Sequence, residues 1–214
     1  SAMSRPSANC PNCGATIQFL WSSAVQTTCP YCKSILVRHD LDLQRVGEVA
    51  DLPASPSPIQ ITTEGVWRNK AFVVIGRILY EYELGGWNEW HLMFQDSTSG
   101  WLSDAQAEYA VSFLRASPQP LPAAGALQRG QRFQFEGAWY EVTSLTQARY
   151  RGVEGELPFE YWDKDQLLFA DLRSPDGRFA TLDYSDAEPL LFLGQAVEFE
   201  ELRLKNLRQF EGWT

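Results

Sequence analysis

The stretch that decides the fold is FVVIGRILYEYELGGWNEWHLMF, residues 72–94. In its first half, apolar and aromatic side chains recur at every second position, and the same period of two returns at Trp90, Leu92 and Phe94. Two adjacent glycines lie between the halves, where a chain reversal needs residues that tolerate unusual backbone angles. The pattern is typical of two antiparallel strands, so it predicts a β-hairpin.

A second part of the chain repeats the order of these features. The similar pieces are, in pairs, 72–82 and 139–145, 92–96 and 167–171, 103–105 and 185–187, and 109–114 and 190–193. The letters match weakly but the order is the same in both parts, which predicts an internal duplication. Strand periodicity dominates both parts.

Residues 103–115 are the one place where a helix competes with a strand. Ser103 to Gln106 fits a capping box at a helix start. The corresponding piece of the second part, however, reaches Pro189 and continues directly as an apolar run. A turn followed by a strand suits both parts, so we expect a strand here.

The four cysteines carry the clearest chemical signal. Cys10, Cys13, Cys29 and Cys32 form the pattern CxxC-x15-CxxC, a spacing typical of zinc sites. Two thiolates on one tight turn can reach the same tetrahedral ion, and a second such turn closes the shell. The alternatives are two disulfides or a redox CxxC, and both are disfavoured, because the N-terminal residues show no secretory signal and no βαβ pattern surrounds a single CxxC. We therefore expect a structural Zn²⁺ ion.

Proline-rich segments divide the chain. They lie at residues 52–58 and 116–124 and are typical of extended spacers. The expected units are a zinc ribbon at residues 8–50 and two β-domains at residues 58–116 and 125–214. The predicted fold class is therefore all-β, with an N-terminal zinc ribbon and two tandem, repeat-related antiparallel β-sheet domains of small barrel or sandwich-like form.

Charge argues against a general nucleic-acid binder. The chain of 214 residues has 18 basic and 27 acidic side chains, a net charge of −9, whereas affinity for phosphate backbones comes mostly from Lys and Arg. The charge is zero through residue 57, −3 over residues 58–122 and −6 over residues 123–214. The last segment therefore suggests a protein partner with a basic surface.

Membrane insertion is not expected either. The longest apolar candidate, residues 71–80, is interrupted by Arg77 and falls short of the roughly 18 residues that a span needs. With no secretory signal at the amino terminus, a cytoplasmic location is expected.

Catalysis has little support in the sequence. The only histidines, His39 and His91, lie just beyond the ribbon and on a predicted strand, where a structural role is the commoner one. Two carboxylate pairs could meet across strands, Glu89 with Asp96 and Asp171 with Asp183, but acidic side chains near turns are usually solvated. No nucleophile elbow or phosphate-binding loop precedes a helix. We expect that the protein is not an enzyme.

The tryptophans suggest a protein-interaction module. Eight are present, and we expect Trp87, Trp90 and Trp162, with Glu89, to form an interface, because aromatic anchors dominate binding energy. The first prediction is thus a non-catalytic adaptor. Two alternatives stay open, a nucleic-acid-binding zinc-ribbon protein and a pair of β-domains that binds a small ligand between them. The sequence does not indicate the oligomeric state.

The order CPNCG, CPYC, a proline break, SPI and VIGRILYEYELGGWNEWHLMFQD resembles a bacterial family catalogued as a domain of unknown function. The resemblance covers residue 10 to about residue 115 well and the second part of the chain more loosely. The second part lacks an equivalent of the run Trp87 to Trp90. It implies a zinc ribbon before a duplicated β-rich domain. It also implies a link to polyamine-synthesis or membrane-stress gene products, and it carries over no catalytic residues.

Overall fold

The computed structural model of the protein describes residues 5–40, 42–49, 51–53, 55–162 and 164–209. Two of the expected domain boundaries, residues 50 and 214, lie outside the described residues. In the described part, no helix is both long and apolar enough to cross a membrane.

The predicted hairpin is present. Strand β7 (Lys70–Tyr82) pairs antiparallel with β8 (Gly85–Phe94), in a register that sets Phe72 opposite Phe94. The reversal falls at residues 83–84, two positions earlier than expected, and Gly85 begins the return strand with a φ of 124°. That angle suits glycine because other side chains would be strained there.

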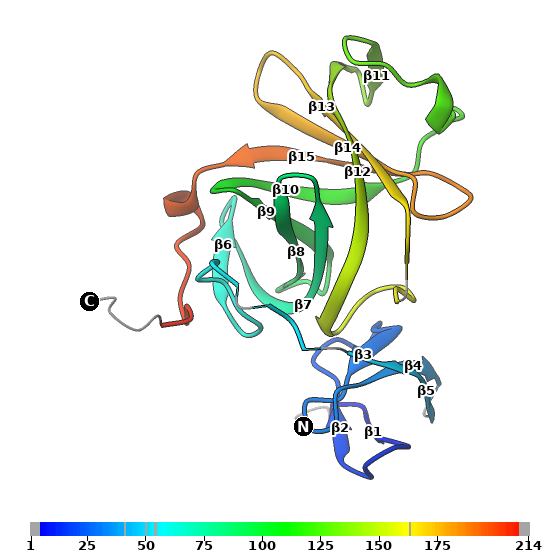
Figure 1. Cartoon of the computed structure of the whole chain (residues 1–214). Coiled ribbons are helices and arrows are strands. Elements are labelled where there is room, and N and C mark those ends of the chain that lie inside the picture. The colour runs from blue at the N-terminus through cyan, green and yellow to red at the C-terminus, as the bar shows by residue number, and fades with distance from the viewer. Residues whose placement is uncertain (1–4, 41, 50, 54, 163, 210–214) are drawn as a thin grey trace.

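Ten strands form one antiparallel sheet in the order β11-β12-β13-β14-β15-β10-β9-β8-β7-β6. Besides β7 and β8, they are β6 (Glu64–Trp67), β9 (Ser99–Ala105), β10 (Glu108–Arg115), β11 (Arg132–Phe135), β12 (Ala138–Gly155), β13 (Leu167–Arg173), β14 (Arg178–Asp183) and β15 (Leu190–Val197). The long β12 pairs with β13 through its first part and with β7 through its last part, which closes strands β7–β10 and β12–β15 into a ring (Figure 1). The all-β class and the antiparallel pairing are confirmed.

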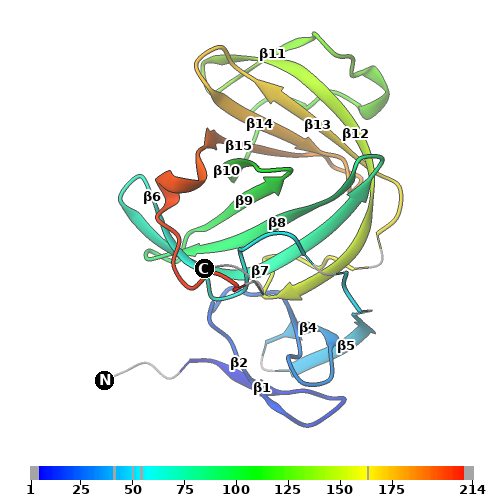
Figure 2. The ribbon, with the colours of Figure 1, turned by 60° about the vertical axis from the view of Figure 1, so that its left-hand side comes forward.

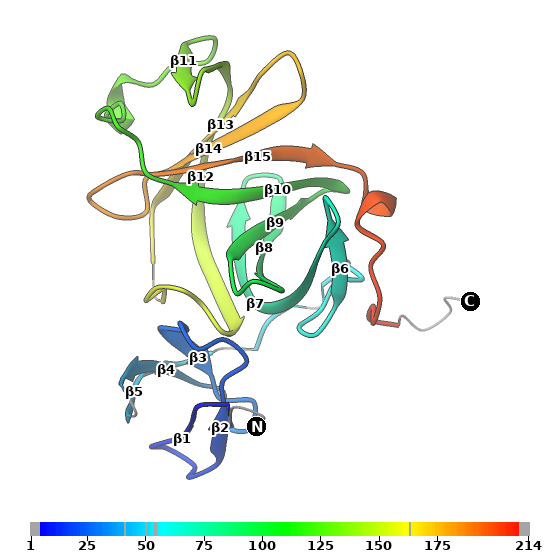
Figure 3. The same cartoon turned by 180° about the vertical axis from the view of Figure 1, so that it is seen from behind.

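The two segments expected as separate β-domains share this sheet. Strand β10 pairs with β15, and β7 pairs with β12, so the two halves join at two places, and the short strands β6 and β11 form the ends of the sheet (Figure 3). The physical reason is that an unpaired edge leaves a row of backbone N–H and C=O groups without partners. The proline-rich segment at 116–124 therefore joins two halves of one closed sheet. Each half contributes five strands in the same order, and their origin by duplication stays a prediction.

Residues 103–115 are extended, as expected. A turn at residues 106–107 separates β9 from β10, and no helix forms there. Short 3₁₀ turns occur elsewhere, η1 (Ala124–Ala126) and η2 (Phe199–Leu202).

The alternation of side chains along the strands of the closed sheet separates three hydrophobic clusters, and a fourth lies between the ribbon and β7. One lies inside the closed sheet and includes Ile78, Tyr80 and Phe169. The outward faces of the two halves are covered by chain that leaves the ring: β6 and the segment around η2 pack on the first half, and β11 with the residues before it packs on the second half (Figure 2). Because the inner and the outer face of the sheet are both covered, the strands carry apolar side chains on both faces rather than on one.

The N-terminal ribbon docks against one end of the closed sheet (Figure 1). It consists of the pair β1 (Ser7–Asn9) and β2 (Thr16–Gln18) and of the three strands β3 (Gln26–Thr28), β4 (Ser34–His39) and β5 (Asp42–Glu48). The Gln26 side chain exchanges two hydrogen bonds with the backbone of Tyr161, at 2.7 and 2.9 Å. The buried carboxylate of Glu156 accepts from the backbone N–H groups of Leu20 and Trp21, at 2.8 and 2.9 Å. These bonds between buried groups hold the ribbon in one orientation.

The chain needs a glycine where β7 lies against Glu156, the residue that contacts the ribbon. A Cβ atom at Gly76 would lie 2.1 Å from the carbonyl oxygen of Glu156. The same oxygen accepts a hydrogen bond from Nδ1 of His91 at 2.8 Å. The lack of a side chain at Gly76 therefore permits the backbone of β7 to approach the backbone of Glu156 closely.

Candidate functional site

The four cysteines come together as the sequence predicts. Their Sγ atoms all lie within 4.8 Å of one another, and none forms a disulfide. Two of the Sγ–Sγ distances, Cys10 to Cys32 and Cys13 to Cys29, are 3.7 Å. Four sulfurs at about 2.3 Å from a central tetrahedral ion would be about 3.8 Å apart, so the cluster is compatible with a metal site.

Each pair of cysteines is placed by a tight turn with the same hydrogen bond. Gly14 N–H donates to the Cys10 carbonyl at 2.9 Å, and Lys33 N–H donates to the Cys29 carbonyl at 3.0 Å. Both donors have a positive φ, 78° for Gly14 and 63° for Lys33. This turn aims both thiols of a CxxC to the same side. Four protein ligands fill a tetrahedral shell, so a bound ion would have no open position for a substrate.

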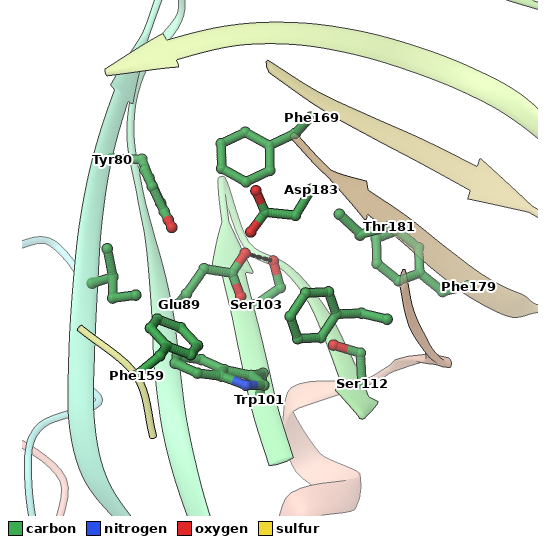
Figure 4. A pocket seen from close by; sticks show the side chains of 12 residues that line it. Tyr80, Glu89, Trp101, Ser103, Ser112, Phe159, Phe169, Phe179, Thr181 and Asp183 are labelled. Carbon is green, nitrogen blue, oxygen red and sulfur yellow. Dashed lines mark hydrogen bonds between the residues drawn. The ribbon is translucent and has the colours of Figure 1, made fainter. Parts of the chain in front are cut away.

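A second candidate site is a cavity of about 50 Å³ inside the closed sheet (Figure 4). Strands from both halves line it, and Phe159, from the segment between β12 and β13, also contacts it. Its wall is aromatic on several sides, with Tyr80, Trp101, Phe169 and Phe179. The cavity therefore lies between the two halves of the ring, where the sequence left open a site for a small ligand.

Polar side chains from opposite sides of the ring meet at this cavity. The Glu89 carboxylate accepts hydrogen bonds from Ser103 Oγ at 2.9 Å and from Trp87 Nε1 at 3.1 Å. Asp183, on the opposite half, accepts from the backbone N–H of Ser185 at 2.8 Å and from its hydroxyl. Figure 4 shows both carboxyl groups pointing toward the middle of the cavity.

A third carboxylate lies on the same inward face. Asp171 accepts from Thr181 Oγ1 at 3.1 Å and from Ser144 Oγ at 3.3 Å. In the register of β13 and β14 it is opposite Thr181, two positions from the pair of Phe169 and Asp183. Asp171 and Asp183 are therefore diagonal neighbours on one face of the sheet. From the sequence, this pair could meet across strands, and the structure brings the two residues to neighbouring strands but not directly opposite each other.

Burial changes the titration of these carboxyls. The pKa of Glu89 is raised to about 8, chiefly by loss of water. Its hydrogen bonds from Ser103 and Trp87 oppose this rise, and the negative charges of Asp171 and Asp183 add to it. Burial also raises the pKa of Asp171 and of Asp183. The interior of the closed sheet therefore resists carrying several negative charges at once.

We expect Glu89→Gln to change how stability depends on pH. The pKa of Glu89 is about 8 in the folded protein and about 4.5 when it is exposed, so the folded state keeps a proton that the unfolded state loses in this interval. Stability contributed by the neutral carboxyl is complete at low pH and is lost as pH rises from about 4.5 to about 8. Since the glutamine side chain stays neutral, the Tm of the Glu89→Gln variant should exceed that of the wild type by about 5 °C near pH 9 and by little near pH 5.

Thermal unfolding from about pH 5 to pH 9 measures this effect. Glu83→Gln is the matched control, because it makes the same chemical change at an exposed position, in the turn between β7 and β8. Parallel curves for the wild type and Glu89→Gln would contradict the expectation.

The residues expected to form a protein interface are buried or partly buried. Trp90 is 2% exposed and donates from Nε1 to Asp104 at 3.2 Å. Trp87 is partly buried and stacks on Tyr80 at 4.8 Å, and the partly buried Trp162 packs against the cluster inside the ring. Glu89 faces the cavity. None of these four side chains projects as an anchor from the described surface.

The two histidines and Asp96 all lie outside the lining of the cavity. His91 is fully buried between Trp21 and Trp101, its Nε2 accepts from Ser99 Oγ at 2.7 Å, and burial lowers its pKa to about 4. His39 is exposed and bonds to Gln44 at 2.9 Å. Asp96 lies on an exposed turn, 3.6 Å from Lys70, and is not part of the cavity wall that includes Glu89.

Sequence reasoning missed the cavity hydroxyls, Ser103, Ser112 and Thr181, as well as the Tyr80 hydroxyl. A signal was present, since these polar groups and Glu89 occupy positions of apolar strands that share a face with large aromatic residues. The sequence could not show that positions from both halves converge, because that depends on the closure of the ring.

A family model described as a domain of unknown function (DUF4178) matches residues 60–199. No curated protein and no solved structure matches the chain. The matched segment begins after the cysteine cluster and includes every strand of the closed sheet from β6 to β15. The expected relation to a domain of unknown function is confirmed, and it extends over the second half as well.

Proposed function

The chain belongs to the DUF4178 family of domains of unknown function, and on that premise we propose that it is a non-catalytic binding protein that holds a small organic molecule inside its closed sheet. The observation that carries this proposal is the cavity between the two halves, with aromatic walls and a few convergent polar groups. Enclosed apolar pockets with a small number of oriented polar groups are the usual form of ligand sites, and closed sheets often contain them.

Binding is favoured over catalysis by the state of His91. Its two ring nitrogens are engaged by Glu156 and Ser99, and its low pKa keeps it neutral. A general base must reach the proton that it removes, and His91 has no free nitrogen for this purpose. The described lining of the cavity includes no histidine or cysteine.

We propose that the ion of the four-cysteine cluster is Zn²⁺ and that its role is structural. The support is the all-sulfur donor set, the tetrahedral spacing and the absence of a free position in a shell of four thiolates. Free thiolates persist in reducing compartments, so we also propose a cytoplasmic location.

A cavity-filling variant tests the binding function. We expect Ser112→Leu to fill the cavity and to abolish binding of small probes, since Ser112 lines it from β10. The probes are alcohols, amines and carboxylic acids of up to about six non-hydrogen atoms, detected by ligand-observed NMR. Ser23→Leu, on an exposed position of the ribbon, is the control.

The expected result is that at least one probe class binds the wild type and the control but not the filled variant. Thermal unfolding should show Ser112→Leu folded, so that lost binding is not lost structure. If no class binds the wild type, or if the filled variant binds equally well, the proposed function is overturned.

An adaptor role is the second candidate, and Trp139 favours it. Its ring is 50% exposed on β12, and Arg132 lies over it at 5.3 Å. It lies in the segment 123–214, whose net charge of −6 suits a basic protein partner. Affinity capture with the wild type and Trp139→Ala tests this role, and identical sets of captured proteins would count against it.

A further inference from the structure

The cavity inside the closed sheet has an acidic lining without a basic counterpart. Glu89 and Asp183 point into it, and Asp171 lies on the same inward face. The described residues that line it include no Lys, Arg or His. These carboxyls act on one another, because the charges of Asp171 and Asp183 raise the Glu89 pKa. A positive charge placed among them would remove this repulsion and favour their ionised forms.

The apolar part of the wall is also suited to a cation. Trp101 and Phe159 stack with ring centroids 5.7 Å apart, and Phe169 and Phe179 contribute from the opposite half. The face of an aromatic ring carries partial negative charge and attracts an ammonium group. The same rings offer apolar area to an alkyl chain.

One buried hydroxyl at the cavity lacks a partner. Ser112 is 7% exposed, and Figure 4 shows its side chain among the groups that line the cavity. Among the residues that the structure describes, none forms a hydrogen bond with its Oγ atom. This hydroxyl therefore faces the cavity space and can donate to or accept from a ligand placed there. It is an observation independent of the acidic groups.

Size limits the ligand. The cavity of about 50 Å³ is smaller than the engineered cavity of about 150 Å³ that takes up benzene. A narrow chain of a few atoms fits this space better than a ring. The narrow form also lets a charged end reach the carboxyls while the remainder contacts the aromatic wall.

We infer that the cavity binds a small organic cation, a primary ammonium on a short alkyl chain, with the ammonium donating to Glu89 and Asp183 and the chain packed on the aromatic rings. This inference rests on the proposed binding function and adds the chemical class of the ligand. The three N–H donors of a primary ammonium match the two ionised carboxyls, which only accept, and the hydroxyls of the lining, which can also accept.

Three probes with a three-carbon chain test the inference: n-propylammonium, 1-propanol and propionate, each titrated into the full chain and followed by protein NMR. The titrations are made at about pH 8.5, where Glu89 is more than half ionised. We expect propylammonium to bind the wild type at least tenfold more tightly than propanol, and propionate to bind most weakly. Potassium chloride at the same concentration controls for ionic strength.

Two variants locate the binding. Glu89→Gln should lower the affinity for propylammonium at least tenfold, whereas Glu83→Gln on the exposed turn should leave it unchanged. Thermal unfolding checks that both variants are folded. If propanol binds as tightly as propylammonium, if potassium chloride causes the same spectral changes, or if Glu89→Gln binds the cation normally, the cation inference is overturned. If propanol or propionate still binds and Ser112→Leu abolishes it, the proposed function stands; if no probe binds, both fail.

Discussion

Replacing Cys29 with serine is expected to release the metal ion and to unfold the ribbon. Cys29 is completely buried, and its Sγ lies 3.7 Å from that of Cys13. The buried cluster of the ribbon is small and is partly built on β7, so we expect a bound metal ion to supply most of the ribbon's folding free energy, on the order of 10 kcal/mol. A hydroxyl is a far poorer ligand than a thiolate for a soft or borderline ion.

The effect should extend to the contact with the closed sheet. Without a folded ribbon, Glu156 loses the two N–H donors of Leu20 and Trp21, and the Tyr161 backbone loses Gln26. We expect the ring of strands to stay folded at a reduced Tm, because its own pairings do not involve the ribbon.

Elemental analysis and amide hydrogen exchange measure this outcome together. The wild type should contain one equivalent of zinc, and Cys29→Ser none, with fast exchange confined to the ribbon. Ser23→Ala, at an exposed ribbon position, should behave as the wild type. A wild-type protein without metal, or a Cys29→Ser variant with a protected ribbon, would refute the structural metal site.

Trp90→Ala is expected to destabilise the closed sheet by about 3–5 kcal/mol. The ring is 2% exposed in the cluster outside the first half, and Arg77 lies over it at 5.1 Å. Truncation leaves a void, and it also removes one of the donors to the buried Asp104, which keeps Ser57 as a partner. In a chain of this length the loss corresponds to a fall in Tm of about 10 °C.

Trp139→Ala is the matched control because it removes an indole that is half exposed. We expect a stability change within about 0.5 kcal/mol, since surface substitutions of this kind remove little packing. Denaturant unfolding of both variants compares them directly. Equal, small losses would show that Trp90 does not pack as described and would restore it as a candidate for an interface.

The distinctive run from Trp87 to Trp90 illustrates what sequence reasoning could reach. Its alternation correctly placed it on a strand, yet aromatic character alone could not separate a core residue from an anchor. In the structure, Asn88 accepts from Arg77 Nε at 2.7 Å, and Arg77 reaches Glu154 at 2.8 Å. Asn88 thus helps to join β7, β8 and β12 on the side away from the cavity, while Trp87 and Glu89 lie on the inner side.

The sequence by itself determined the strand pattern, the antiparallel pairing of the hairpin and the cluster of four cysteines. These features depend on a period of two and on a spacing of two residues, which are local properties of the chain. Only the tertiary structure decided that β12 bends from β13 to β7, so that two similar halves close one sheet. That closure brings Glu89 and Asp183, 94 positions apart in the chain, to one cavity. The physical reason is that pairing of edge strands satisfies backbone groups regardless of sequence identity, so which edges meet is settled by the geometry of the whole sheet.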